Sequence, residues 1–103
     1  MTKLFKKKTK ELKTTAENII FEQLLSDEDA IITNLAVKLK EGSPLVLNFE
    51  KLEPTGTNKV IAFLSGFCFS IGGEVRPIKN LTYLFCNHDA FDDGSLQELL
   101  NNI

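Results

Sequence analysis

A chain of 103 residues that is 43% hydrophobic and 25% charged has the length and composition of one small globular domain rather than of a disordered protein. No apolar run approaches the roughly 18 residues that a membrane-spanning helix needs, and no apolar segment follows the N-terminal lysines as in a secretory signal. The net charge is −2, but residues 1–13 hold six lysines and one glutamate, so the remainder is acidic. We therefore expect a cytoplasmic protein whose basic arm contacts an anionic surface.

The expected organisation is an N-terminal arm, residues 1–17, followed by an α/β core, residues 18–103. If the arm is helical, Met1, Leu4, Phe5, Lys8 and Leu12 share one face, which gives a thin apolar stripe with lysines on the remaining surface. Basic amphipathic helices of this kind bind anionic membrane surfaces, so the predicted membrane-binding residues are Leu4, Phe5, Lys6, Lys7 and Lys8. A solvated disordered tail is the alternative. Nucleic-acid binding is not expected, because the arm lacks arginine and any aromatic platform beyond Phe5.

The first part of the core is expected to fold as strand, helix and strand. Residues 18–25 are rich in branched and aromatic side chains, which is typical of a strand. The helix that follows is predicted to start at the N-cap Ser26 and to end at Gly42, with an inward stripe made of Ile31, Ile32, Leu35 and Leu39. Residues 44–49 form the second strand, in which Leu45, Leu47 and Phe49 point one way and Val46 and Asn48 the other.

The second part is expected to continue with a helix over residues 60–71, capped by Thr55 or Thr57 and stopped by Gly72-Gly73. A third strand over 74–78 contains Pro77, which indicates an edge strand or a bulge, because proline cannot donate to a ladder. Lys79-Asn80 then turns a hairpin into residues 81–86, where Leu81, Tyr83 and Phe85 share one face. Ser95 caps a short last helix, whose apolar side is Leu96, Leu99, Leu100 and Ile103. This order predicts an α/β two-layer sandwich: a small mixed β-sheet with two main helices on one face and a short C-terminal helix.

The segment VIAFLSGFCFSIGG, residues 60–73, is apolar on nearly every side, although packing against a sheet uses only one side of a helix. The surplus apolar surface predicts an interface, and Gly66 in mid-helix would allow another backbone to approach. We therefore expect a homodimer in which this helix meets its symmetry mate, through Phe63, Gly66, Phe67 and Phe69. The alternative is that the first and last helices bury it within one chain.

Three segments in order, LKEGSPLVLNFEKL, KVIAFLSGFCFSIGGEVRPI and LTYLFC, resemble the core domain of SepF, a bacterial and archaeal cell-division protein associated with FtsZ. The resemblance covers roughly residues 18–90. It implies a non-enzymatic adaptor: an amphipathic N-terminal helix on the membrane, a linker, and a dimerising core that binds the C-terminal tail of FtsZ. Some members polymerise, so higher polymers are also implied. The linker in this chain is much shorter than family members usually have.

The resemblance also implies where the FtsZ tail binds: near the hairpin and its neighbouring helices, through a basic and an aromatic residue. Tyr83 matches the aromatic position, but the basic position falls near Pro77, where this chain departs from the family. Arg76 or Lys79 would then supply the positive charge. The alternative is that Tyr83 is an ordinary core residue, and that Arg76 and Lys79 are solvated charges. The implied location is peripheral, on the inner membrane face at the division site.

No group of residues points to catalysis, a metal or a cofactor, and none is expected. His88 lies beside Asp89 and close to Cys86, but no second cluster completes a metal site. Cys68 and Cys86 lie in apolar segments and are expected to be buried thiols of a reducing compartment. The remaining rival function is a small dimeric regulatory domain that binds a ligand at its interface.

Overall fold

The computed structural model describes residues 14–102. All five predicted membrane-binding residues, Leu4 to Lys8, lie outside this range, as do Met1, Leu12 and Ile103. The described elements, in chain order, are a 3-10 turn η1 (Ala16–Asn18), β1 (Ile20–Gln23), α2 (Asp29–Lys40), β2 (Leu45–Asn48), α3 (Pro54–Ser70), β3 (Glu74–Lys79), β4 (Thr82–Cys86) and α4 (Ser95–Asn101).

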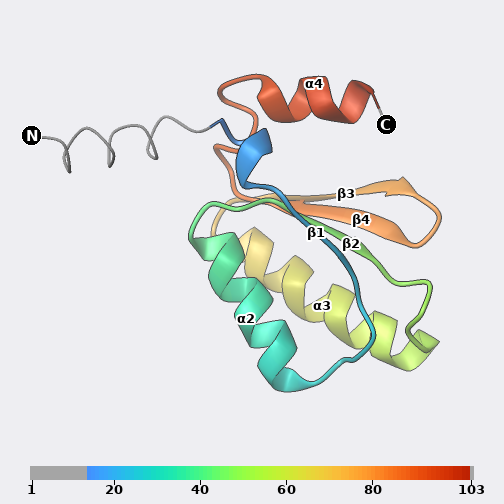
Figure 1. Cartoon of the computed structure of the whole chain (residues 1–103). Helices are drawn as coiled ribbons and strands as arrows, with labels where there is room; N and C mark the ends of the chain where they lie inside the picture. The colour runs from blue at the N-terminus through green and yellow to red at the C-terminus, as the bar shows by residue number, and fades with distance from the viewer. Residues whose placement is uncertain (1–13, 103) are drawn as a thin grey trace, which may run out of the picture.

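The four strands form one mixed sheet with the order β1-β2-β4-β3. β1 runs parallel to β2, and the other two pairings are antiparallel. Figure 1 shows α2 and α3 on one face of the sheet and η1 and α4 on the other. The predicted α/β fold, with a mixed sheet, two main helices on one face and a short C-terminal helix, is confirmed. The short helix adds a partial third layer to the predicted sandwich.

Strand alternation builds a separate apolar cluster on each face of the sheet. Leu45, Leu47 and Phe49 belong to the larger cluster, under α2 and α3, while Val46 belongs to the smaller one, under α4. The larger cluster also holds buried residues of the two main helices: Ile32, Leu35, Ala36, Leu39, Val60, Leu64 and Cys68. The smaller cluster is completed by Leu84, Cys86, Ala90 and Leu96. The predicted sidedness of β2 is therefore confirmed.

Glycines end both main helices, as the sequence predicts. Gly72 has a φ of +75°, in the left-handed region that glycine adopts without a steric penalty. Its N–H donates to the carbonyl of Phe69 (3.1 Å), and the N–H of Gly73 donates to that of Cys68 (2.7 Å). This pair of bonds satisfies carbonyls that the last turn of a helix would otherwise leave unpaired. The same pattern closes α2 at Gly42, with a φ of +103°.

The predicted N-caps of the two main helices are wrong. α2 begins at Asp29, with Glu28 in the cap position, and Ser26 instead accepts a hydrogen bond from the N–H of Glu28 (3.1 Å). α3 begins at Pro54, earlier than predicted, so Thr55 and Thr57 lie inside the helix. Proline suits the first helical position because its φ is already helical and its missing N–H would have no helical partner there.

Ser95 is the first residue of α4 rather than its cap, and Gly94, with a φ of +78°, takes the cap position. The N–H and hydroxyl of Ser95 both donate to Asp93 Oδ1, at 3.0 and 2.7 Å. The same loop holds the start of the described chain, because the N–H of Thr15 donates to Asp93 Oδ2 (2.9 Å) and that of Ala16 to Ser95 Oγ (3.0 Å). Residues 14–18 are thereby fixed beside α4.

β3 is an edge strand and also carries an irregularity at the predicted position. Pro77 pairs with Tyr83, but the next register partner is Lys79 with Thr82, so Ile78 is an extra residue on β3. Such a bulge interrupts a ladder and changes the facing of the side chains that follow. The hairpin turn lies one residue later than predicted: Lys79 still belongs to β3, and Asn80 and Leu81 form the turn, with Leu81 at a φ of +50°.

Candidate functional site: a sheet groove and an exposed helix face

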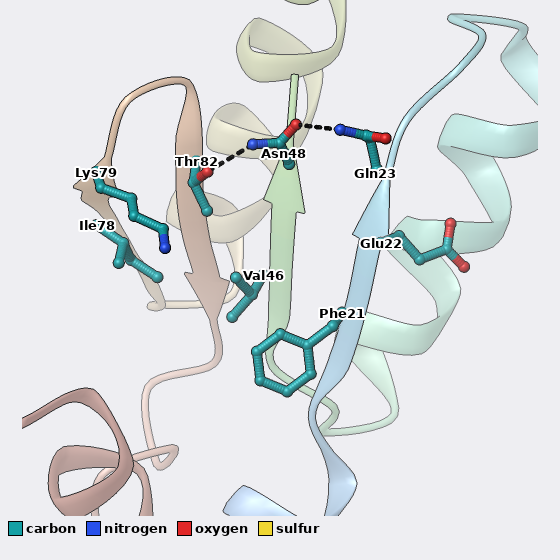
Figure 2. A pocket seen from close by; sticks show the side chains of 8 residues that line it. All are labelled: Phe21, Glu22, Gln23, Val46, Asn48, Ile78, Lys79 and Thr82. Atoms are coloured by element: carbon teal, nitrogen blue, oxygen red, sulfur yellow. Dashed lines mark hydrogen bonds between the residues drawn. The ribbon is translucent and has the colours of Figure 1, made fainter. Parts of the chain in front are cut away.

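α4 covers one end of its face of the sheet, and the other end is a groove of about 430 Å³. The groove crosses all four strands, and its lining is Phe21, Glu22, Gln23, Val46, Asn48, Ile78, Lys79 and Thr82 (Figure 2). Phe21, Val46 and Ile78 make its floor apolar, and the side chain of Phe21 is 59% exposed. The volume lies in the range of sites that bind small molecules or short peptide segments.

One end of the groove is a fixed polar network centred on Asn48. The Asn48 amide donates to Thr82 Oγ1 (2.8 Å) and to Glu50 Oε1 (2.9 Å). Its oxygen accepts from Gln23 Nε2 (3.0 Å) and from the N–H of Glu50 (3.1 Å). The side chain of Asn48 is therefore satisfied within the chain and holds β1, β2 and β4 together, so it shapes the groove more than it offers free donors.

The bulge in β3 brings Lys79 to the groove. In a regular strand, Ile78 and Lys79 would face opposite sides of the sheet, but both line this groove. Figure 2 shows the Lys79 amine directed over the groove, whereas Glu22 points away from it, from the far side of β1. Within residues 14–102, Lys79 forms no ion pair. The groove therefore presents one unpaired ammonium group beside an apolar floor.

Tyr83, predicted to bind the FtsZ tail, faces the other side of the sheet. It is partly buried against the larger cluster and packs edge-to-face on Phe49, with 5.9 Å between the ring centroids. Arg76 lies on the groove side but near α4: its Nε is 2.7 Å from Glu74 Oε2, and its guanidinium carbon is 4.3 Å from the ring centroid of Phe91. Within one chain, the structure does not bring Arg76, Lys79 and Tyr83 together.

No element among residues 14–102 covers the outward side of α3. Phe63 is 49% exposed and Phe69 67% exposed, while Phe67 is partly buried. Gly66 between them is exposed, and a Cβ built on it would meet no atom within 4 Å outside its own helix. α4 lies across the sheet from α3, so the first and last helices do not bury α3 between them as the alternative supposed. The four predicted interface residues all lie on this helix.

The thiols and the histidine do not form a reactive group. Burial raises the pKa of Cys68 and that of Cys86 to about 11. His88 is exposed, and its Nδ1 lies 2.9 Å from Asn87 Oδ1. Among residues 14–102, no group of three or more His, Cys, Asp or Glu side chains is placed to hold a metal ion.

Sequence reasoning missed the groove as a unit, although it assigned Val46 and Asn48 to one face of their strand. The missing signal was Phe21, a large aromatic residue in a strand that turned out to lie at the sheet edge. None of the helices within residues 14–102 has the length and apolar character needed to cross a membrane.

Comparison with known proteins identifies the family. The family model described as "Cell division protein SepF" matches residues 19–89. A curated protein of that name from Carboxydothermus hydrogenoformans is 31% identical over 80 residues, which cover 78% of this chain and 56% of the relative. A curated protein of the same name from Listeria monocytogenes serotype 4a is 30% identical over 67 residues, which cover 65% of this chain and 44% of the relative. The chain thus spans about half the length of these relatives. It belongs to the SepF family of cell-division proteins.

Proposed function

We propose that this protein is a cell-division adaptor that binds the C-terminal tail of FtsZ, self-associates through α3 and is held at the inner membrane face by its basic arm. The observation that carries the proposal is the SepF family match over residues 19–89, which takes in every described strand and both main helices. The exposed α3 face supports its self-association step, because an adaptor gains avidity when several copies act together.

Self-association through α3 accounts for features that the single chain leaves unexplained. Phe63 and Phe69 are large apolar side chains in contact with water, and covering them would contribute about 25 cal/mol for each Å² of apolar surface. Gly66 in mid-helix costs about 1 kcal/mol relative to alanine. No contact within the described chain requires a glycine at this position. We therefore infer that Gly66 allows the α3 of a second copy to approach closely. Higher polymers would need a further contact elsewhere.

The FtsZ tail is placed on the α3 side of the hairpin in this proposal, because Tyr83 faces that side. The SepF resemblance places the family's basic residue near Pro77, which the register sets opposite Tyr83 and which is apolar and uncharged. Arg76 and Lys79 lie on the other side of the sheet. We therefore expect the contact at Tyr83 to be mainly apolar, with the tyrosine hydroxyl as its polar handle.

Membrane attachment rests on residues 1–13, which lie outside the described residues. Each lysine near an anionic surface contributes about 1 kcal/mol, while the apolar stripe of the arm is thin. A single arm would therefore bind weakly, and a self-associated adaptor with several arms would bind much more tightly.

The decisive experiment is calorimetric titration of the purified chain with a peptide from the C-terminus of its host's FtsZ. Two variants on opposite faces of the hairpin, Tyr83→Ala and Lys79→Gln, serve as each other's control. We expect saturable binding that Tyr83→Ala weakens and Lys79→Gln leaves unchanged. No binding by a folded, self-associating chain would contradict the adaptor function, whereas loss in Lys79→Gln alone would move the tail to the groove.

A further inference from the structure

We propose that the groove between Phe21 and Lys79 is a second docking site, separate from the surface at Tyr83, for an extended partner peptide that carries a carboxylate beside apolar side chains. This goes beyond the proposed function, since binding the FtsZ tail at Tyr83 uses neither the groove nor its side of the sheet. Apolar contact and charge support this occupant.

The floor of the groove offers apolar contact that residues 14–102 leave unused. Phe21 is 59% exposed, although its strand neighbours Ile20 and Leu24 pack inward. Its ring stands beside Val46 and across the groove from Ile78 (Figure 2). An apolar side chain laid between these residues would remove both surfaces from water, which is favourable in proportion to the area covered.

The charge in the groove selects an acidic occupant. Among residues 14–102, Arg76 pairs with Glu74, and Lys59 Nζ lies 3.0 Å from Asp29 Oδ1. Lys38, Lys40, Lys51 and Lys79 form no ion pair, and of these four Lys79 lines the groove. Lys79 has no such partner among residues 14–102, and its amine is directed over the floor. An acidic side chain on the occupant would complete a charge-assisted hydrogen bond there. The same ammonium group disfavours the lysine-rich arm of this chain as the occupant.

The test uses two synthetic peptides that differ only in charge, acetyl-Val-Glu-Val-Glu-Val-amide and acetyl-Val-Lys-Val-Lys-Val-amide. Each is titrated into the isotope-labelled full chain while backbone amide resonances are followed. We expect the acidic peptide to shift the amides of Phe21, Val46 and Lys79 saturably, and the basic peptide to bind about tenfold more weakly. Lys79→Gln should weaken the acidic peptide by about the same factor. Lys51→Gln, the same change outside the groove, and Tyr83→Ala should leave its binding unchanged.

Three results would overturn the proposal. One is the absence of saturable shifts at the groove in the folded chain. Another is equal affinity for the two peptides, or an affinity that Lys79→Gln does not alter. The third is displacement of the acidic peptide by the FtsZ tail peptide, with shifts at the same amides, because the groove would then be the tail site and not a second one. The first two results do not depend on where the FtsZ tail binds, and the third would itself demonstrate tail binding. Failure of this proposal and failure of the adaptor function are therefore distinguishable.

Discussion

Lys79 and Tyr83 belong to one hairpin and face opposite sides of the sheet. Tyr83 packs on Phe49 under the main helices, while Lys79, turned by the bulge in β3, lines the groove on the other side. A ligand on one face can therefore lose its contact without any change on the other. The paired variants proposed above use this separation, because each alters one face of the same hairpin.

Gly66→Ala is expected to stabilise the monomer. A Cβ at this position meets nothing within 4 Å, and alanine in mid-helix is favoured over glycine by about 1 kcal/mol. Urea unfolding at a concentration where the chain is monomeric should show this gain. Sedimentation at high concentration should show weaker self-association, because the added methyl group would hold two α3 helices apart. Unchanged self-association would argue against a close approach at this glycine.

Gly73→Ala, the same chemical change, should have the opposite effect. A Cβ on Gly73 would overlap the backbone carbonyl of Cys86, which cannot move without disturbing β4. We expect a loss of about 1–3 kcal/mol in the free energy of unfolding, as for other overpacked sites. Measured beside Gly66→Ala, a stability equal to that of the unaltered chain would show that α3 and β4 are not packed as described.

Phe63→Glu and Leu64→Ala test the two sides of α3 at neighbouring positions. Phe63 is 49% exposed, so its replacement should abolish self-association while the monomer stays folded. Leu64 is fully buried, so its truncation should cost about 2–5 kcal/mol of stability. Sedimentation and urea unfolding measure the two effects. Self-association that survives Phe63→Glu would exclude this face as the interface.

Asp93→Asn should reveal a pH-dependent contact between the start of the described chain and α4. The backbone N–H of Thr15, with further bonds from Ser95, lowers the pKa of Asp93 from 3.8 to about 2. Because the folded-state pKa is depressed, the stabilisation is present above about pH 4 and is lost as the pH falls toward 2.

The measurement is urea unfolding of both chains across this range of pH. The unaltered chain should be more stable than Asp93→Asn at pH 6, and the difference should vanish near pH 2. A difference that stays constant with pH would mean that the carboxylate charge is not what holds Thr15. Amide exchange at Thr15 and Ala16 should be faster in the variant.

Cys68 and Cys86 should be nearly inert to alkylation in the folded chain. The thiolate is the reactive form, and burial raises the pKa of both thiols to about 11. Iodoacetamide at pH 8 should therefore label both rapidly in urea and slowly in buffer. Rapid labelling of the folded chain would show that one of the two apolar clusters opens readily.

The alternation of side chains along the strands predicted most of the fold. The alternation of Leu45, Val46 and Leu47 predicted both faces of β2, and Pro77 predicted an edge strand with a bulge. The predicted helix starts are wrong because residue type alone does not make a serine or threonine the cap. At α3 the fixed backbone of Pro54 determined the first turn instead. Local preference is a weak guide where the connection to a neighbouring element sets the boundary.

The candidate sites were less predictable, because they depend on sidedness after a bulge. Strict strand alternation past Pro77 would put Ile78 and Lys79 on opposite faces of the sheet. The bulge puts both on the same face, where they form one wall of the groove. The exposed α3 face was predictable, since a helix apolar all round cannot bury every side against one sheet. Which of its phenylalanines stay exposed depended on where α2 packs.

The hydrogen bonds from Thr15 and Ala16 to Asp93 and Ser95 bring the two ends of the described chain together. A short linker spanning the length of α4, about 10 Å, would join them. The core is therefore suited to circular permutation, with new ends opened in the exposed turn after α2. Such permutants would keep the sheet and move the basic arm to another corner of the core. They would show whether the direction from which the arm leaves, rather than its sequence alone, governs attachment to a surface.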